Sequence, residues 1–293
     1  MNACVESVCP GAMVPPTVEP AAKAEAIRDD RPSGWLAWIH GRHAKATMAM
    51  PRIVHVHVES FFAAVEQAQE PRLRGKAVLV ASGNAVASAS AEAMARGVKP
   101  GMSVEEARRL NPGAVVLAGR VALYEEYSGR LRAILESHAS EVEAAALGSF
   151  YLGFSKARWV PSDPEAVLRG LQAEIWGGVG VNVSMGGGSS RSVASVAARL
   201  HQPCGLRIVA PGSEREFLAA QPIRELRGIG RRHAEALAAG GIARVGELQR
   251  VPKGALVAAF GARVGEKVWE VARGRDGYDW RPLWDRASGG ALA

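Results

Sequence analysis

Strand-like and helix-like segments alternate along the chain from Arg52 to about Pro211, and the alternation stops after that point. Short runs rich in β-branched residues, such as those at 52–58 and 77–81, predict strands because such residues suit a pleated, half-buried surface. Between these runs, apolar residues at three- and four-residue spacing predict amphipathic helices. A chain with this pattern packs helices onto a mixed sheet, so we predict an α+β fold for residues 50–210.

The other segments of this region are assigned in the same way. We expect helices at 61–69, 103–110, 122–139, 164–178 and 189–200, strands at 114–119 and 180–187, and a hairpin of paired strands at 141–155. In the long helix, helical spacing predicts an apolar side made of Leu123, Tyr127, Leu131 and Ile134. The glycine-rich segment MGGGSS, Met185–Ser190, ends a predicted strand and precedes a predicted helix. It predicts a close-packed turn between them rather than a phosphate site, because no Gly-Lys-Ser/Thr follows it.

The strand at 52–58 carries two different sets of side chains. Period-2 alternation places Val54, Val56 and Val58 on one face and His55, His57 and Glu59 on the other. A helix is expected to begin at Phe61, which puts Glu59 at the carboxyl end of the strand. Sheets with helices packed on them commonly place their sites at that end, so this edge is a candidate site.

Helix and turn signals dominate after the sheet region, and we expect a small all-α domain at 211–283. Within it, the segment LRGIGRRHAEAL at 226–237 places two glycines between helical segments. Glycines permit a tight turn, and the backbone N–H groups at the next helix start can bind phosphate. This pattern predicts a helix-hairpin-helix that grips DNA without reading its sequence, with a plain helical hairpin as the alternative. The residues expected to contact DNA are Gly228, Ile229, Gly230, Arg231 and Arg232.

Charge and the chain's flanks constrain its surroundings. The net charge is +7 and the isoelectric point is near 9.7, which is compatible with binding nucleic acid. Residues 1–49 are expected to form a flexible extension and 284–293 a tail. No apolar run approaches the roughly 18 residues of a membrane span, and the first thirty residues lack a signal-peptide pattern, so a cytoplasmic location is expected.

Taken in order, these segments resemble a Y-family translesion DNA polymerase of the DinB/UmuC type. The family's opening strand, aromatic pair and turn are matched by RIVHVHVESFFAAVEQAQEPRLRGKAVLV, its fingers by ASASAEAMARGVKPGMSVEEARRLNP, its acidic hairpin by ALGSFYLGF and its thumb hairpin by LRGIG. The resemblance spans about 51–283. It implies α+β palm and fingers domains, with the fingers at about 60–119 inserted in the palm. An all-α helix-hairpin-helix thumb would follow at 211–283, and we expect no little-finger domain.

The resemblance also implies where a metal site would lie. In the family, three carboxylates on adjacent strands hold two Mg²⁺ ions. At those positions this chain has His57, Gly148 and Ser149, and Glu59 is the carboxylate that the opening motif retains. Because Mg²⁺ requires hard oxygen ligands in near-octahedral geometry, we expect no bound metal, no cofactor and no catalytic residue. The chain is therefore predicted not to be an enzyme.

Four further positions match the family's nucleotide pocket: Phe62, Ala91, Met94 and Arg191. Ala91 and Met94 stand where the resemblance implies a tyrosine and an arginine that contact the triphosphate. Arg191 replaces a phosphate-contacting lysine and keeps its charge. Phe62 matches the residue that excludes the ribose 2′-OH, and we expect it to act in packing.

These features predict a non-catalytic, DNA-binding scaffold in DNA damage tolerance and translesion synthesis. Such a chain resembles ImuB-type members of the family, which implies weak DNA binding through the backbone and contacts with a sliding clamp, a RecA-like protein and another DNA polymerase. The segment WRPLW, Trp280–Trp284, is weakly similar to a clamp-binding peptide, with an ordinary thumb terminus as the alternative. Two other hypotheses stay open: a low-activity polymerase that uses Glu59 with Mg²⁺ or Mn²⁺, and a protein-interaction module without DNA binding.

Overall fold

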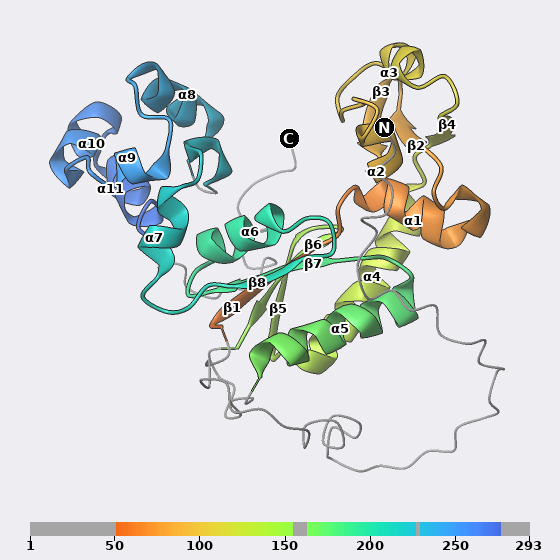
Figure 1. The fold of residues 1–293 in the computed structure, drawn as a ribbon, viewed down its shortest axis with the longest axis horizontal. Coiled ribbons are helices and arrows are strands. Elements are labelled where there is room, and N and C mark those ends of the chain that lie inside the picture. Colours follow the sequence, from red (N-terminus) through yellow and green to blue (C-terminus); the bar gives the residue numbers. More distant parts are fainter. Residues whose placement is uncertain (1–50, 155–162, 227–228, 277–293) are drawn as a thin grey trace, which may run out of the picture. The chain divides into compact units, whose positions relative to one another are not determined.

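Residues 51–154, 163–226 and 229–276 are described by the structure, a computed structural model. Their main feature is a five-stranded sheet in the order β5-β6-β1-β7-β8 (Figure 1). The strands are β1 (Ile53–His57), β5 (Glu141–Ala146), β6 (Ser149–Gly153), β7 (Ser184–Gly188) and β8 (Leu206–Ile208). β1 pairs antiparallel with both β6 and β7, and β8 runs parallel to β7. β1, whose carboxyl end is followed by Glu59, therefore lies at the centre of the sheet.

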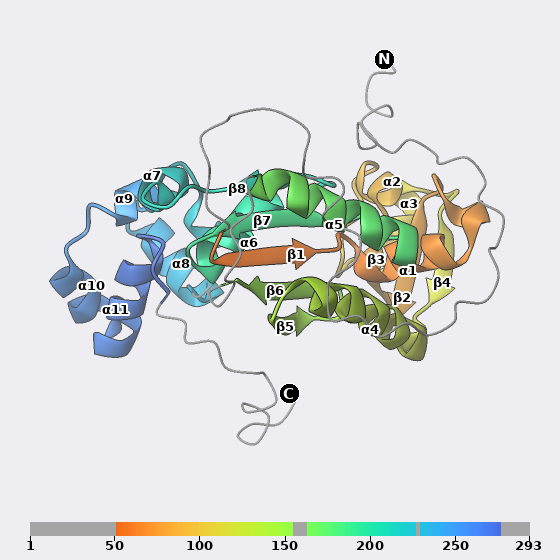
Figure 2. The same ribbon diagram turned by 90° about the horizontal axis from the view of Figure 1, so that it is seen from below.

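Helices cover both faces of this sheet. Figures 1 and 2 show α4 (Val121–His138) and α5 (Pro164–Val179) on one face and α6 (Arg191–Leu200) on the other. The valines of β1 are completely buried in the core formed with α4 and α5. On the opposite face, Ala194 of α6 packs with Ile53 and Tyr151. The alternation predicted for β1 is confirmed, but both of its faces are covered.

The glycine run lies inside β7 and explains how closely α6 approaches the sheet. A Cβ placed on Gly186 would lie 2.2 Å from both the Ala194 carbonyl oxygen and the Ala198 backbone nitrogen. A strand can approach a helix this closely only where it has no side chain. The predicted position of the run Met185–Ser190 is confirmed, because its glycines end β7 at Gly188 and Ser190 caps α6, which begins at Arg191.

A second, three-stranded sheet has the order β3-β2-β4. It consists of β2 (Val78–Ser82), β3 (Ala85–Ala89) and β4 (Val115–Ala118), and is accompanied by α1 (Phe61–Gln69), the 3₁₀ turn at Pro71–Leu73, α2 (Ala91–Met94) and α3 (Val104–Leu110). Ser103 caps the N-terminus of α3, since its hydroxyl accepts a hydrogen bond from the Glu106 N–H at 3.1 Å. Neither β3 nor β8 was predicted from the sequence.

The described part of the chain beyond the sheets is helical, as predicted. It contains α7 (Glu214–Ala219), a 3₁₀ turn at Ile223–Glu225, α8 (Arg231–Ala239), α9 (Val245–Leu248), α10 (Lys253–Phe260) and α11 (Ala262–Val271). Leu237, Leu248 and Val268 belong to the buried core of this part. Gly261 joins α10 to α11 with φ 79°, a left-handed conformation that glycine adopts at little cost.

All four residues predicted for the apolar side of α4 pack in or against the core, but they are not buried to the same extent. Tyr127 and Leu131 are buried as expected, whereas Leu123 and Ile134 are only partly buried. Tyr124 and Leu135 are buried in addition, which moves the buried stripe by one position at each end. The buried Tyr124 hydroxyl donates to the Glu66 carboxylate at 2.7 Å.

One buried carboxylate connects α1 with the start of α4. The Glu66 side chain is 1% exposed and pairs with the Arg120 guanidinium, whose Nε lies 3.0 Å from Oε1. Burial, the largest cause, and the hydrogen bond to Glu66 raise the pKa of Tyr124 to about 12. Tyr124 also stacks on Phe62 with ring centroids 4.5 Å apart. The packing role expected for Phe62 agrees with this contact.

Candidate functional site

The pairing of β1 with β6 brings the polar strand end and the hairpin together. His57 is opposite Ser149 in the strand register, and the Val58 N–H donates to the Gly148 carbonyl at 2.8 Å. Immediately beyond, Ser60 adopts a left-handed backbone conformation with φ 51° and turns the chain from β1 into α1. Positions 57, 148 and 149, which are far apart in the sequence, therefore form one edge, as the hairpin prediction required.

His55, which strand alternation places on the same face as His57, has a partner that the sequence did not predict. Its Nε2 lies 2.8 Å from the Ser149 hydroxyl, and both side chains are buried. The His55 ring also stacks on His57 with centroids 5.8 Å apart and tilts against Tyr151 at 4.7 Å. Strand alternation placed His55 and His57 on one face, but their partners come from β6 and depend on register. Ser149 is thus bound to a histidine of the neighbouring strand.

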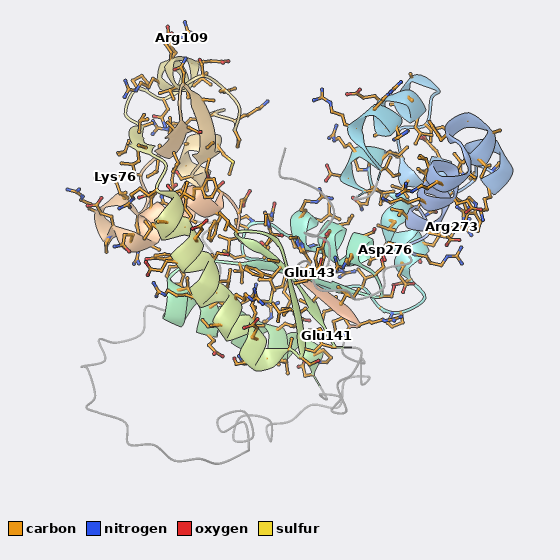
Figure 3. All side chains as sticks on the ribbon, turned by 180° about the vertical axis from the view of Figure 1, so that it is seen from behind. Lys76, Arg109, Glu141, Glu143, Arg273 and Asp276 are labelled. Atoms are coloured by element: carbon orange, nitrogen blue, oxygen red, sulfur yellow. The ribbon has the colours of Figure 1, made fainter. Side chains whose placement is uncertain are left out.

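Arg191 lies at the first position of α6, and its charge is directed at a carboxylate of β5. Its Nη1 donates to Glu143 Oε1 at 2.8 Å, and both side chains are almost completely buried. Its guanidinium lies 4.6 Å from the centre of the Tyr151 ring, whose hydroxyl is 2.5 Å from Ser195 Oγ. Figure 3 shows Glu143 on the sheet next to Glu141. The charge predicted to face a triphosphate is therefore paired inside the protein.

Gly148 has no room for a side chain in this arrangement. A Cβ at this position would lie 2.5 Å from the Phe61 ring, which belongs to the buried core. A carboxylate here would require the ring to move. Within the three described ranges, no group of three or more His, Cys, Asp and Glu residues is placed to hold a metal ion. As arranged, the described residues do not fit a pair of Mg²⁺ ions, each of which requires near-octahedral oxygen ligands.

Glu59 is the carboxylate of this edge. Its side chain is partly buried, and burial raises the pKa of its carboxyl above the ordinary value. Such a shift indicates that the charged form is poorly solvated in its pocket. Met94, one of the four predicted pocket residues, lies near this edge, with its sulfur 3.8 Å from the Ser60 hydroxyl. Ala91 is exposed at the first position of α2 and contributes no polar group.

The predicted DNA-binding hairpin is described from Ile229 onward, and Gly228 lies outside the described residues. Gly230 caps α8 with φ −62°, so it needs no left-handed conformation, and an added Cβ would meet only His233 Nδ1 at 3.7 Å. The tight-turn argument for this glycine is therefore wrong. The first N–H groups of a helix have no acceptor within it, so the start of α8 can still bind a phosphate.

The first turn of α8 presents its basic side chains to solvent. Arg231 Nε lies 2.8 Å from Glu235 Oε1 in an exposed pair. Arg232 and His233 line an open cavity of about 390 Å³ with Phe260 of α10, together with Ala236 and Ala259. Ile229, by contrast, is buried in the core and cannot contact DNA through its side chain. Its predicted contact is therefore restricted to its backbone.

None of the helices in the described ranges is both long and apolar enough to cross a membrane.

Two family profiles match the chain. The first, described as the impB/mucB/samB family, covers residues 56–199, and the second, the thumb domain of DNA polymerase iota, covers 224–276. Together they cover the sheet region and the helical region in the predicted order.

Similar proteins carry the name DNA polymerase IV. The one from Alkalilimnicola ehrlichii is 32% identical over 248 residues, which cover 83% of this chain and 70% of the relative. The one from Pseudomonas putida is 30% identical and the one from Streptomyces coelicolor 33%, and the chain spans 66% and 48% of their lengths. Solved structures agree: a ternary complex of Dbh has a TM-score of 0.70 at 27% identity, covering 78% of this chain and 68% of Dbh. DinB from Sulfolobus solfataricus has a TM-score of 0.68 at 28% identity, covering 76% of this chain and 67% of DinB.

These relatives contradict the prediction that the chain is not an enzyme. Proteins named as polymerases align with more than three quarters of it. The prediction judged activity from the residue types at a few motif positions. Activity depends instead on which oxygen donors the folded chain and its substrates assemble in three dimensions, and a count of motif positions does not determine that.

Proposed function

Because the chain belongs to the impB/mucB/samB family of Y-family DNA polymerases, we propose that it binds primer–template DNA and acts in translesion DNA synthesis. The observation that carries this proposal is the helical region, which matches a polymerase thumb over 224–276 and has a solvent-exposed basic helix start. The likeness to a Dbh ternary complex supports it. Binding through phosphates is expected to be independent of sequence and sensitive to salt.

Removing both arginines at the start of α8 is expected to weaken DNA binding. In Arg231→Ala/Arg232→Ala, two phosphate contacts are lost, so the slope of log affinity against log salt should decrease by about 2. Fluorescence anisotropy of a labelled primer–template between about 50 and 200 mM salt measures both affinity and slope.

A matched control removes the same charge elsewhere. Arg132 and Arg169 lie on α4 and α5, and each forms an exposed pair with a glutamate four residues away, as Arg231 does. Arg132→Ala/Arg169→Ala should leave the slope within error of the wild type. Equal slopes for the α8 variant and the control would contradict the thumb contact.

We infer slow nucleotidyl transfer as the reaction of this chain, in line with the name of its relatives. Among His57, Glu59, Gly148 and Ser149, Glu59 is the one carboxylate, and burial raises the pKa of its carboxyl. Glu59→Ala is expected to abolish primer extension measured with Mg²⁺ or Mn²⁺ in the buffer. His138→Ala, which changes a residue at the far end of α4, serves as the control. Extension that survives in Glu59→Ala would exclude Glu59 from the reaction.

An accessory role beside another polymerase is a second candidate. The packing of Phe61 over Gly148 favours it, because this packing leaves Glu59 without a neighbouring carboxylate at position 148. Contacts with a sliding clamp, a RecA-like protein and a second polymerase stay predictions, and Trp280–Trp284 lies outside the described residues. Co-purification of the full chain with each purified candidate, with and without DNA, would test these contacts one at a time.

A further inference from the structure

A cluster of cations surrounds one tryptophan in the helical region. The Trp269 ring of α11 has three cationic groups around it: Arg273 at 4.0 Å, Arg275 at 5.1 Å and Lys253 at 6.0 Å from its centre. Arg215 contributes a fourth positive charge, which acts electrostatically on Arg273. These five residues are called the Trp269 cluster below. Figure 3 shows Arg273 on this part of the molecule.

The path of the chain explains why these residues meet. Helices α10 and α11 form a hairpin around Gly261, so the start of α10 and the end of α11 lie at the same end of it. Lys253 is the first residue of α10, and Arg273 and Arg275 follow the last residue of α11. The cavity with Phe260 and His233 lies at the other end, where α10 finishes. Eight helical residues, about 12 Å, separate the two ends.

Positive charge in the cluster exceeds the negative charge available to it. Arg275 pairs with Glu270 at 2.6 Å and Lys253 with Glu266 at 2.9 Å. Within the described ranges, neither Arg215 nor Arg273 forms an ion pair. Burial, and then the neighbouring Arg215 and Arg275, lower the pKa of Arg273. Four cations therefore share two carboxylates, and an added anion would relieve their mutual repulsion.

Arg273 is held in place, and two other cations of the cluster are exposed to solvent. The Arg273 guanidinium donates to the Trp269 carbonyl at 3.0 Å and to the Gln249 carbonyl at 2.6 Å, which fixes it against the ring. The side chains of Arg275 and Lys253 are 57% and 45% exposed. Fixed cations lose less conformational entropy when they bind an anion than freely rotating ones do.

We propose that the Trp269 cluster binds the phosphate backbone of DNA, as a contact separate from the hairpin at α8. The inference rests on the proposed DNA-binding function. A regular line of phosphates fits a surface that offers several cations, and here Arg273 lies over the apolar face of the Trp269 ring. An acidic peptide would offer charge too, but peptides usually need an apolar anchor for affinity.

The test removes the two exposed cations of the cluster in the full chain. Lys253→Ala/Arg275→Ala is expected to lower the slope of log affinity against log salt by about 2 and to weaken primer–template binding roughly tenfold at 100 mM salt. Arg132→Ala/Arg169→Ala, with the same loss of charge, should behave as the wild type. Because both replaced side chains are exposed, the urea unfolding midpoint is expected to stay unchanged and shows that the variant is folded.

Three results would overturn the inference. If the wild type binds DNA and the Lys253/Arg275 variant has an unchanged slope, the cluster does not bind DNA although the proposed function stands. If the variant loses binding to a poly-glutamate peptide but keeps its DNA affinity, the surface belongs to an acidic protein partner. If the wild type does not bind primer–template DNA at any salt concentration, this inference and the proposed DNA binding both fail.

Discussion

Gly186→Ala is expected to destabilise the chain by about 3 kcal/mol, at the upper end of what overpacking usually costs. The added methyl group would lie 2.2 Å from two backbone atoms of α6, the Ala194 carbonyl oxygen and the Ala198 nitrogen. Backbone atoms inside a helix cannot move aside as a flexible side chain can. The helix must therefore shift away from β7, or the strand must leave the sheet. Urea unfolding followed by circular dichroism measures the change in the free energy of unfolding.

A second glycine provides the control for this prediction. Gly170 lies in α5, is exposed, and has no atom within 4 Å of an added Cβ. Gly170→Ala should therefore stabilise the chain by about 0.5–1 kcal/mol, because alanine has the better helix propensity. Equal unfolding midpoints for the two variants would show that α6 does not pack against β7 as closely as described.

Gly186 also matters for the site. It lies opposite His55 in the β1–β7 register, and α6 begins with Arg191, which pairs with Glu143. A displaced α6 would carry Arg191 away from Glu143 and expose the Tyr151 ring beneath it. In Gly186→Ala, the free energy of primer–template binding by the folded fraction is expected to change less than the free energy of unfolding. The reason is that α8 and the Trp269 cluster lie in the helical region and not in β7.

Arg120→Ala is expected to cost about 3 kcal/mol, the lower end for breaking a buried ion pair, because Arg120 itself is half exposed. Glu66 would keep a hydrogen bond from Tyr124 but lose its cationic partner while 1% exposed. A buried carboxylate without a cation has lost most of the interaction that compensates its desolvation. The measurement is again the free energy of unfolding in urea.

Two comparisons isolate the buried charge as the cause. Arg132→Ala removes an exposed pair with Glu136 and should cost less than about 0.5 kcal/mol. Glu66→Gln combined with Arg120→Ala should recover part of the loss, because a neutral amide is less costly to bury than a carboxylate. If Arg120→Ala costs no more than Arg132→Ala, the Glu66 pair does not hold α1 to α4.

Local sequence determined most of the helices and strands of this chain. The strand at β1 and the helix α1 follow directly from period-2 alternation and helical spacing, and α1 has the predicted bounds. β3 and β8 escaped prediction because AVASA and LRI have little periodicity of their own. They are strands through pairing with β2 and β7, a stabilisation that comes from other parts of the chain.

The candidate site also has features that the sequence determined and features that only the tertiary structure decided. Sequence alone determined which residue types are present at the strand end, namely His57, Glu59, Gly148 and Ser149, and placed basic residues after a glycine turn in the helical region. Only the tertiary structure decided their partners. His55 contacts Ser149, which lies 94 residues away in the sequence, and Arg191 contacts Glu143, which lies 48 residues away. Backbone periodicity is a local property that neighbouring residues specify, whereas side-chain partners depend on strand register and on the approach of α6, which distant segments set together.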